Sequence, residues 1–486
     1  MVRMARLLLA QEALLPPNFA QNAPLRVRLA RRILIIGAPR FQDNQQRQHS
    51  LSARIGKLGP LYIKIGQFLA TRADIVGPIM AADLRQLQDR LPPFSQTALT
   101  HILNSELEHS ENYLANISPA LAAASIAQVH QAHRPDAPAQ KLAVKVLRPN
   151  IEKQIAVELR GFARMAWLVE KLMPSSRRLR PIASIETLRR TLTAETDLRL
   201  EAAALSEMAE NCKNDAHFAV PSVVWEASNK RVLTMQWVDG VAISDIATLR
   251  TKQHDLSGLA VRLIRIFLTQ ALRDGFFHAD MHQGNLLVRD DGTLVAIDLG
   301  IIGRLDGDSR RFLAEILHGF ITRDYMKVAR VHMQAGYVPA HHNVEEFAQA
   351  LRAIGEPIRD QNAENISMAH LLTQLFEVTG QFDMHTQPQL LLLQKTMVTV
   401  EGVARSLDPQ LNIWDAAEPV VSDWMHQSLG PQALVRDITD NAGDAVRAFI
   451  HFPETLAQLQ TGAQNLEKIA DYIAKPRRKT ALWLGG

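Results

Sequence analysis

The sequence predicts an α+β fold of two lobes, in which the first lobe holds a β-sheet and the second is mostly helical. Short apolar segments with strand-like alternation occupy residues 141–147 and 231–240, whereas the apolar spacing in residues 243–271 and 309–405 is helical. A length of 486 residues is enough for two or three domains. We therefore expect a helical extension, a sheet-containing lobe, a helical lobe and a helical tail at residues 1–118, 119–240, 241–425 and 426–486.

Composition and charge narrow the class of protein. The chain is 47% hydrophobic and 21% charged, so it can bury a large core. Its one cysteine, Cys212, excludes an internal disulfide framework and fits a reducing compartment. The net charge is only +4, yet residues 1–50 hold eight arginines against Glu12 and Asp43. This basic region predicts an anionic neighbour, either lipid headgroups or nucleic acid, unless its arginines only solubilise amphipathic helices.

The sequence contains neither a signal peptide nor an apolar run of about 18 residues, so we expect no membrane-spanning segment in it. However, the basic residues 475–479 lead into Ala-Leu-Trp-Leu at residues 481–484. A basic flank followed by an interfacial Trp is typical of the start of a membrane helix. We expect residues 426–486 to lead toward membrane helices that this sequence lacks, and the alternative is a frayed polar tail.

One stretch of polar residues has the spacing of a catalytic loop. His278, Asp280 and Asn285 follow the pattern H-x-D-x-x-x-x-N of protein kinases. A hairpin with the turn Asp291-Gly292 then folds the chain back and brings Asp298 close to Asn285. We expect Asn285 and Asp298 to hold Mg²⁺, and Asp280 to accept or orient a hydroxyl or a water. The alternative is a polar loop whose side chains are buried and hydrogen-bonded but have no catalytic role.

Nucleotide-binding residues are expected in the preceding lobe. Its alanine-rich stretch resembles a strand–loop–strand lid over phosphates with alanine in place of glycine, although such a stretch alone is more often helical. An apolar strand with one inward lysine follows, which is the order of a kinase N-lobe and predicts that Lys145 holds the α- and β-phosphates. Backbone groups at residues 236–238 are expected to meet the adenine edge. The expected nucleotide-binding residues are Leu121, Ala122, Ala123, Ala124, Ser125, Ile126, Ala127, Gln128, Val129, Lys145, Glu201, Met235 and Val238.

The connection from Lys145 to Glu201 is longer than in an ordinary kinase N-lobe, so we expect an inserted helix. Helical patterns cover residues 151–173 and 182–210. A buried ammonium needs an anionic partner. Glu195 and Glu201 are six residues apart in the second helix, so they occupy different faces and one of them can pair with Lys145.

A polar helix face is expected before the two lobes. Four polar residues recur at helical intervals: Lys64, Gln67, Thr71 and Asp74. Such a face is usually just solvated. Here it lies among apolar residues that would dock the helix onto another part of the chain: Leu61, Ile65, Phe68 and Leu69.

These motifs resemble the UbiB family of atypical kinase-like proteins of ubiquinone biosynthesis, over roughly residues 50–410. The resemblance rests on K-x-G-Q at Lys64–Gln67, Ala-Ala-Ala-Ser at residues 122–125, Ala-Val-Lys ending at Lys145, E-x-D at Glu195 and Asp197 followed by Glu201, His278–Asn285 and Asp298. Residues 393–397 and 401–409 also look like the family. One departure is Leu299, because an aromatic residue commonly follows the metal-binding aspartate. The other is the lack of the two C-terminal membrane helices that bacterial members typically carry.

The resemblance implies an atypical protein-kinase-like bilobal fold with extra N-terminal helices and a mostly helical C-lobe. It implies that ATP or ADP lies with Mg²⁺ between the lobes and that Asp280, Lys145 and Asn285 are the catalytic residues. It further implies that Glu201 orients Lys145. It also implies that the K-x-G-Q helix covers the place of a protein substrate. Lys64 and Gln67 would then lie near the E-x-D carboxylates, and the regulatory residues would be Lys64, Gln67, Glu195 and Asp197.

The activity implied is an ATPase or small-molecule kinase at the cytoplasmic face of a bacterial inner membrane. Its implied partners are anionic lipid, polyprenyl-phenol quinone intermediates and other quinone-biosynthesis proteins, and not nucleic acid. Two other functions compete with it. A non-catalytic, nucleotide-gated scaffold that presents lipid is disfavoured by the complete set of catalytic residues. A Ser/Thr protein kinase is disfavoured because no Ala-Pro-Glu follows Asp298.

Overall fold

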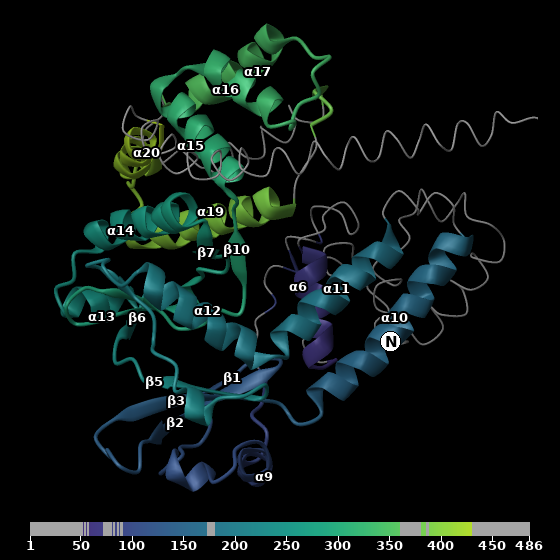
Figure 1. Ribbon diagram of the computed structural model, residues 1–486, viewed down its shortest axis with the longest axis vertical. Coiled ribbons are helices and arrows are strands. Elements are labelled where there is room, and N and C mark those ends of the chain that lie inside the picture. The colour runs from purple at the N-terminus through teal and green to yellow at the C-terminus, as the bar shows by residue number, and fades with distance from the viewer. Residues whose placement is uncertain are drawn as a thin grey trace, which may run out of the picture.

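The computed structural model describes residues 58–70, 91–172, 180–359, 381–384 and 388–429, together with single positions between residues 52 and 87. These residues form a sheet-containing lobe and a larger helical lobe (Figure 1). The predicted α+β fold of two lobes is therefore confirmed. The basic region at residues 1–50 and most of the expected tail at residues 426–486 lie outside the described residues. Among the described helices, none combines the length and apolar character that crossing a bilayer requires.

A four-stranded antiparallel sheet forms the centre of the first lobe, in the order β1-β2-β3-β5. Its strands are β1 (Ala122–Ala123), β2 (Ala127–His133), β3 (Lys141–Leu147) and β5 (Val232–Gln236). The register places Val129 of β2 and Leu233 of β5 on either side of Lys145. The alanine-rich stretch is thus a strand–loop–strand hairpin, as expected, and not a helix.

Alternation along β3 decides where Lys145 points. Successive side chains of a strand face opposite sides of the sheet. One side packs against α9 (Gln96–Glu106), and its buried β3 residues are Leu142, Val144 and Val146. The other side faces the second lobe, and it carries Ala143, Lys145 and Leu147. Because both faces are covered, the strand is buried along almost its whole length and Lys145 is fixed toward the cleft between the lobes.

Helices α10 (Ile151–Leu172), α11 (Pro181–Glu195) and α12 (Leu198–Asn211) connect β3 to the rest of the lobe. The expectation of one helix over residues 182–210 is wrong, because the chain breaks at Thr196 and Asp197. The Asp197 side chain accepts a hydrogen bond from the Arg199 N–H and so caps the start of α12. Consequently the insertion before α12 consists of two helices, and Glu195 and Glu201 lie on separate helices.

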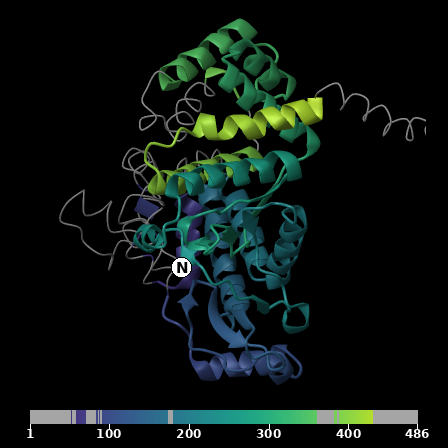
Figure 2. The same cartoon turned by 90° about the vertical axis from the view of Figure 1, so that its left-hand side faces the viewer.

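The helical lobe is organised around α14 (Leu256–Thr269), which packs against α19 (Pro388–Leu407) and α20 (Ile413–Leu429). Figure 2 shows these helices stacked across the molecule above the sheet-containing lobe. The remaining helices are α13 (Ile246–Thr251), α15 (Gly307–Thr322), α16 (Tyr325–Gln334) and α17 (Val344–Arg359). Short helical turns are η1 (Ser110–Asn112), η3 (Trp225–Ala227), the π-helical η4 (Gln270–Asp274) and η5 (Gln283–Asn285).

Two small sheets carry residues 278–285, the candidate catalytic loop. One has the order β4-β9-β8-β6 and contains β4 (Phe218–Ala219), β6 (Val241–Ala242), β8 (Leu286–Val288) and β9 (Leu294–Ala296). The other pairs β7 (Phe276–His278) with β10 (Ile302–Arg304). The predicted hairpin is the β8–β9 pair, in which Leu286 lies opposite Ala296. Gly292 has a φ of 78°, which only glycine adopts easily, whereas Asp291 has no positive φ. Arg289 pairs with Thr293, so the turn spans the three residues Asp290–Gly292 and not the expected two.

The pairing of β7 with β10 depends on one glycine. Gly303 lies opposite Phe277, and a Cβ added at Gly303 would lie 2.1 Å from Cζ of that fully buried ring. Replacing Gly303 by Ala is therefore expected to lower the free energy of unfolding by about 1–3 kcal/mol, measured by urea denaturation. Gly307→Ala is the matched control, because a Cβ there meets nothing within 4 Å. Equal stabilities of the two variants would contradict this role of Gly303.

Candidate active site

Three charged side chains meet between the two lobes. The Nζ atom of Lys145 lies 2.7 and 2.9 Å from the two carboxylate oxygens of Glu201 and 2.8 Å from Oδ2 of Asp298. Lys145 and Glu201 are buried, whereas the side chain of Asp298 is 40% exposed. The structure thus brings together the lysine and its expected glutamate. It also adds the expected metal ligand, Asp298, to the same ammonium.

The charges in this cluster are unequal, because one ammonium faces two carboxylates. Burial favours the neutral form of Lys145, but the charges of Asp298 and Glu201 outweigh burial and raise the pKa of Lys145 above its ordinary value. Burial also disfavours the charged form of Asp298, yet the nearby Lys145 ammonium holds the pKa of that carboxyl well below its usual range. Burial and the neighbouring Asp298 charge raise the pKa of Glu201. Ionised Asp298, the most exposed of the three, therefore offers negative charge to a cation in the cleft.

The β8–β9 hairpin places Asn285 near Asp298. The main-chain N–H of Ile297 donates to the main-chain oxygen of Asn285 at 3.0 Å, so the residue before Asp298 is bonded to Asn285. The Nδ2 group of Asn285 donates to the main-chain oxygen of Asp280 at 3.1 Å, which turns the amide oxygen away from that carbonyl. An amide oxygen and a carboxylate are oxygen donors of the kind that Mg²⁺ prefers. The residues present therefore fit a magnesium ion.

The buried side chain of His278 bonds to the backbone of the candidate catalytic loop. It is completely buried, and burial lowers the pKa of its imidazole. Its main-chain N–H donates to Oε1 of Gln270 at 3.1 Å, and its Nδ1 accepts from the main-chain N–H of Asp280 at 3.4 Å. Gln270 begins the π-helical turn η4, a distortion that often marks functional sites. His278 is thus placed as a positioning residue for Asp280.

Helix α19 contacts the candidate catalytic loop through Lys395 and Thr396, two residues that motif reasoning missed, and also through Ser406, whose Oγ accepts from Nε2 of Gln283 at 3.3 Å. The Nζ atom of Lys395 lies 3.4 Å from Oδ1 of Asp280, and Oγ1 of Thr396 donates to the main-chain oxygen of Ala279 at 3.0 Å. Lys395 is the only charged residue in the run from Leu390 to Met397. The sequence signal for Lys395 is its position as an isolated lysine in an apolar helical run. Residues 393–397 resemble the family, but the resemblance gives Lys395 no role.

Hydrogen bonds from Arg148 anchor the base of the alanine-rich hairpin. The main-chain oxygen of Ala124 accepts from Nε and Nη2 of Arg148, at 3.0 and 2.9 Å, and Nη2 also donates to the main-chain oxygen of Pro92 at 3.0 Å. Val129 lies opposite Lys145 on the cleft side of the sheet. Arg148, to which the sequence assigned no role, therefore fixes the loop relative to β3.

One expected nucleotide contact is corrected by this register. Gln128 lies opposite Val146, so its side chain is on the α9 side of the sheet and not on the side of Lys145. There its Oε1 accepts from the main-chain N–H of Phe94 at 3.0 Å, and its Nε2 lies 2.8 Å from Nε2 of His130. Only the main chain of Gln128 remains available to a ligand in the cleft.

The other expected contacts fall into three groups. Ala127 and Met235 are buried on the cleft side, and Met235 lies opposite Ala143 in the β3–β5 pair. Val238 follows β5 and is nearly buried. In the hairpin, the side chain of Leu121 is exposed, and the remaining members lie in or next to its loop: Ala122, Ala123, Ala124, Ser125 and Ile126.

The K-x-G-Q motif lies on α6 (Pro60–Ala70), which docks on the inserted helices. The Nζ atom of Lys64 lies 2.9 Å from Oε2 of Glu195 at the end of α11. A Cβ at Gly66 would lie 2.3 Å from Cδ1 of Leu87, so the glycine of the motif permits close packing. Gln67 is half-buried on the same helix, whereas Thr71 and Asp74 lie outside the described residues. The helix is docked, and a freely solvated face is excluded for Lys64.

The two E-x-D carboxylates do not share one partner. Glu195 pairs with Lys64, as the resemblance implied. Asp197 instead lies 2.6 Å from Nη2 of Arg199 and caps α12. The implied pairing with Lys64 is thus seen for Glu195, whereas the partner of Asp197 is Arg199, because the helix break turns the Asp197 side chain toward the start of α12.

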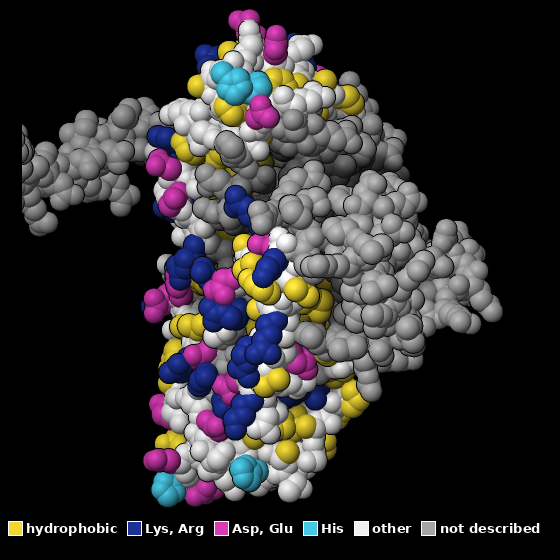
Figure 3. Space-filling view, turned by 90° about the vertical axis from the view of Figure 1, so that its right-hand side faces the viewer, with side chains coloured by type: hydrophobic (Ala, Val, Ile, Leu, Met, Phe, Trp, Pro, Cys, Tyr) yellow, Lys and Arg dark blue, Asp and Glu magenta, His cyan; other side chains and the backbone are white. Residues whose placement is uncertain are grey.

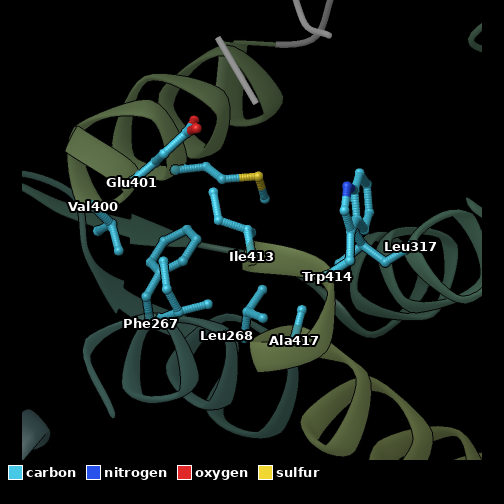
Figure 4. A pocket seen from close by; sticks show the side chains of 10 residues that line it. Phe267, Leu268, Leu317, Val400, Glu401, Ile413, Trp414 and Ala417 are labelled. Carbon is cyan, nitrogen blue, oxygen red and sulfur yellow. The ribbon is translucent and has the colours of Figure 1, made fainter. Parts of the chain in front are cut away.

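A small cavity lies in the helical lobe, between α14, α15, α19 and α20 (Figure 4). Its volume is about 20 Å³, and its lining includes Phe267, Leu268, Leu317, Ile413 and Trp414. By comparison, a cavity that binds benzene has about 150 Å³. This cavity is therefore a packing gap and not a site for an aromatic ligand.

Comparison with known proteins identifies the family. The ABC1 atypical kinase-like domain model matches residues 86–332, and the UbiB helical domain model matches residues 351–412. A "Probable protein kinase UbiB" from Marinobacter nauticus is 38% identical over 459 residues, which cover 92% of this chain and 84% of that protein. The chain belongs to the UbiB family. Proteins of the same name from Aeromonas hydrophila and Tolumonas auensis are 38% and 40% identical and cover 95% and 90% of this chain, and 86% and 82% of their own lengths.

The fold of this UbiB family member also matches a solved structure. The Rv3197–erythromycin complex from Mycobacterium tuberculosis has a TM-score of 0.53 and 21% sequence identity. The match covers 81% of this chain and 98% of that one. The atypical kinase-like fold and the family implied by the motifs are thus confirmed.

Proposed function

We propose that this UbiB family protein binds ATP or ADP with Mg²⁺ between its lobes and hydrolyses or transfers the terminal phosphoryl group in support of ubiquinone biosynthesis. The observation that carries the proposal is the contact of Lys145 with both Glu201 and Asp298. Kinases hold nucleotide phosphates with a β-strand lysine that a helix glutamate orients beside a metal-binding aspartate. The match to a kinase-like domain supports the same class of reaction.

In this proposal each residue has one task. Lys145 keeps its two hydrogen bonds to Glu201 and turns its third N–H from Asp298 to phosphate oxygens. Asn285 and Asp298 would hold Mg²⁺, which neutralises phosphate charge when bound. Asp280 accepts a hydrogen bond from the attacking hydroxyl or water and takes its proton. The buried His278 keeps Asp280 in place.

The acceptor in this proposal is water or a small molecule and not a protein. Support comes from α6, which is anchored by the Lys64–Glu195 ion pair and by the edge-on contact of Tyr62 with Phe162 of α10. A helix held in this way occupies space beside the lobe that a protein substrate would need. Gln67 lies on the same helix and would act with Lys64 and Glu195 in restricting access.

We propose that this reaction takes place at the surface of a lipid membrane. The positive charge of residues 1–50 and 475–479 favours anionic lipid over neutral surfaces. We place the protein at the cytoplasmic face of the inner membrane. There it would act on, or give access to, polyprenyl-phenol intermediates and would meet other quinone-biosynthesis proteins.

The experiment that tests the proposed function uses bacterial cells that lack this protein. Wild type is expected to restore ubiquinone content and growth on a respiratory carbon source, whereas Asp280→Asn is not, because it removes the proton acceptor. Asp291→Asn in the exposed hairpin turn is the matched control and should behave as wild type. Full restoration by Asp280→Asn would show that the protein supports ubiquinone synthesis without this chemistry.

A further prediction concerns the effect of the alanine-rich loop on the relative affinities for ATP and ADP. Glycine at position 123 has more backbone freedom than alanine, by roughly 0.5–1 kcal/mol. We therefore expect Ala123→Gly to change the ratio of ATP to ADP affinity by about two- to fivefold, measured by calorimetric titration. Ala139→Gly, in the exposed turn between β2 and β3, should leave the ratio unchanged. Unaltered affinities in Ala123→Gly would contradict a special role of the alanines.

A further inference from the structure

Two histidines and an aspartate converge far from the active site. His341 and His342 lie in the turn between α16 and α17, and Asp383 lies in the short segment before α19. One ligand atom from each of the three side chains lies within 4.8 Å of the others. Figure 3 shows histidine side chains beside an acidic one at the end of the molecule that α16 and α17 form.

The distances in this cluster suit a metal better than a direct hydrogen bond. The Nε2 atoms of His342 and His341 lie 3.5 and 4.0 Å from Oδ2 of Asp383. Tetrahedral zinc with ligand bonds of about 2.1 Å sets neighbouring ligand atoms about 3.4 Å apart. The two histidine–carboxylate distances are thus near the edge length of a zinc tetrahedron, and the third pair of ligand atoms lies within 4.8 Å.

The inner histidine has an unused ligand atom. The side chain of His342 is 18% exposed, and within the described residues its Nε2 atom is buried and has no hydrogen-bond partner. A buried polar atom without a partner is costly. Coordination of a cation by Nε2 would remove this cost, because the nitrogen lone pair then has a partner.

Packing beneath the cluster holds the ligands in place. The ring of His342 lies 5.4 Å from that of Phe382, which in turn lies 4.9 Å from that of Phe347 in a buried apolar cluster. The main-chain N–H of His342 donates to the oxygen of Pro339 at 3.2 Å and closes the turn. Two of the three ligands are therefore carried by backbone that the core already fixes.

We propose that His341, His342 and Asp383 form a binding site for a divalent first-row transition ion, with Zn²⁺ as the preferred ion. Two imidazoles and one carboxylate select such ions over Mg²⁺, which prefers oxygen ligands alone. Water completes the shell on the exposed side. The ion links the α16–α17 turn to the segment that enters α19, and so it stabilises the outer end of the helical lobe.

The test measures zinc on the full chain in the presence of Mg²⁺ and ADP, which occupy the proposed nucleotide site. After dialysis against micromolar free Zn²⁺, wild type is expected to retain one more equivalent of zinc than the variant His341→Ala/His342→Ala. Asp383→Asn keeps the side-chain shape and is expected to weaken zinc binding by about 10- to 100-fold. Substituted Co²⁺ should give the visible absorption of four-coordinate cobalt in wild type alone.

A matched control separates this site from ordinary surface histidines. His109 lies 3.5 Å from Glu111, so it reproduces one histidine–carboxylate distance of the cluster, and among the described residues no third metal-binding side chain joins the pair. His109→Ala is expected to retain as much zinc as wild type. Equal retention by wild type and the double histidine variant overturns the proposal, and so does a six-coordinate cobalt spectrum that the double variant shares.

Discussion

Replacing Asp298 by Asn is expected to lower kcat for Mg²⁺-dependent ATP hydrolysis by about 10²–10³-fold. Asparagine keeps the shape of the side chain but removes the negative charge that faces both Lys145 and the proposed Mg²⁺. Because Lys145 keeps Glu201 as a buried partner, the fold should survive the change. The measurement is steady-state phosphate release by purified protein, with circular dichroism as the check on folding.

The control for this prediction is Asp290→Asn, which removes an exposed aspartate from the nearby hairpin and its ion pair with Lys252. That variant should hydrolyse ATP as wild type does, since surface ion pairs contribute little. If Asp298→Asn kept full activity, neither the metal site nor the role of Lys145 as a phosphate ligand could stand as proposed.

The second large effect is expected at Lys395. Its ammonium lies 3.4 Å from Oδ1 of Asp280, from where it can reach a transferring phosphoryl group beside that aspartate. We expect Lys395→Met to lower kcat by about 10²-fold while KM for ATP changes little, because the contact matters most where charge develops in the transition state. Steady-state kinetics over a range of ATP concentrations would separate the two parameters.

Lys252→Met provides the comparison for this variant. Lys252 is an exposed lysine of the same lobe and lies 2.7 Å from Oδ1 of Asp290. Its loss should leave kcat and KM unchanged. A rise in KM without a fall in kcat for Lys395→Met would mean that Lys395 holds the substrate before reaction and does not act on the transition state.

The sequence predicted those parts of the site that local structure determines. The short β8–β9 hairpin brings Asp298 toward Asn285, and the Asp-Gly pair identified this hairpin although its turn has three residues and not two. Lys145 could also be predicted, because an inward-facing lysine in an apolar strand must find an anionic partner. Glu201 is the partner of Lys145 that the resemblance implied, although the helix that carries it, α12, is shorter than predicted.

Other parts depend on contacts between distant residues. Lys395 and Asp280 are 115 residues apart, and no local pattern links them. The side of the sheet that Gln128 faces depends on strand register, where a shift of one residue reverses every side chain. The break before α12 was missed because Thr196 and Asp197 stand between two good helical segments, and only the cap at Asp197 reveals it.

The contacts of Lys395 and Thr396 with residues 279 and 280 make the helical phase of α19 a requirement for the proposed activity. Each residue of an α-helix advances 1.5 Å and turns by about 100°. One extra residue between Pro388 and Lys395 would therefore rotate Lys395 and Thr396 away from Asp280 and Ala279. Four extra residues would nearly restore the direction of both side chains but would shift them by about 6 Å along the helix axis. Natural variation in length should consequently be excluded from this part of α19, even though its sequence is mostly interchangeable leucine.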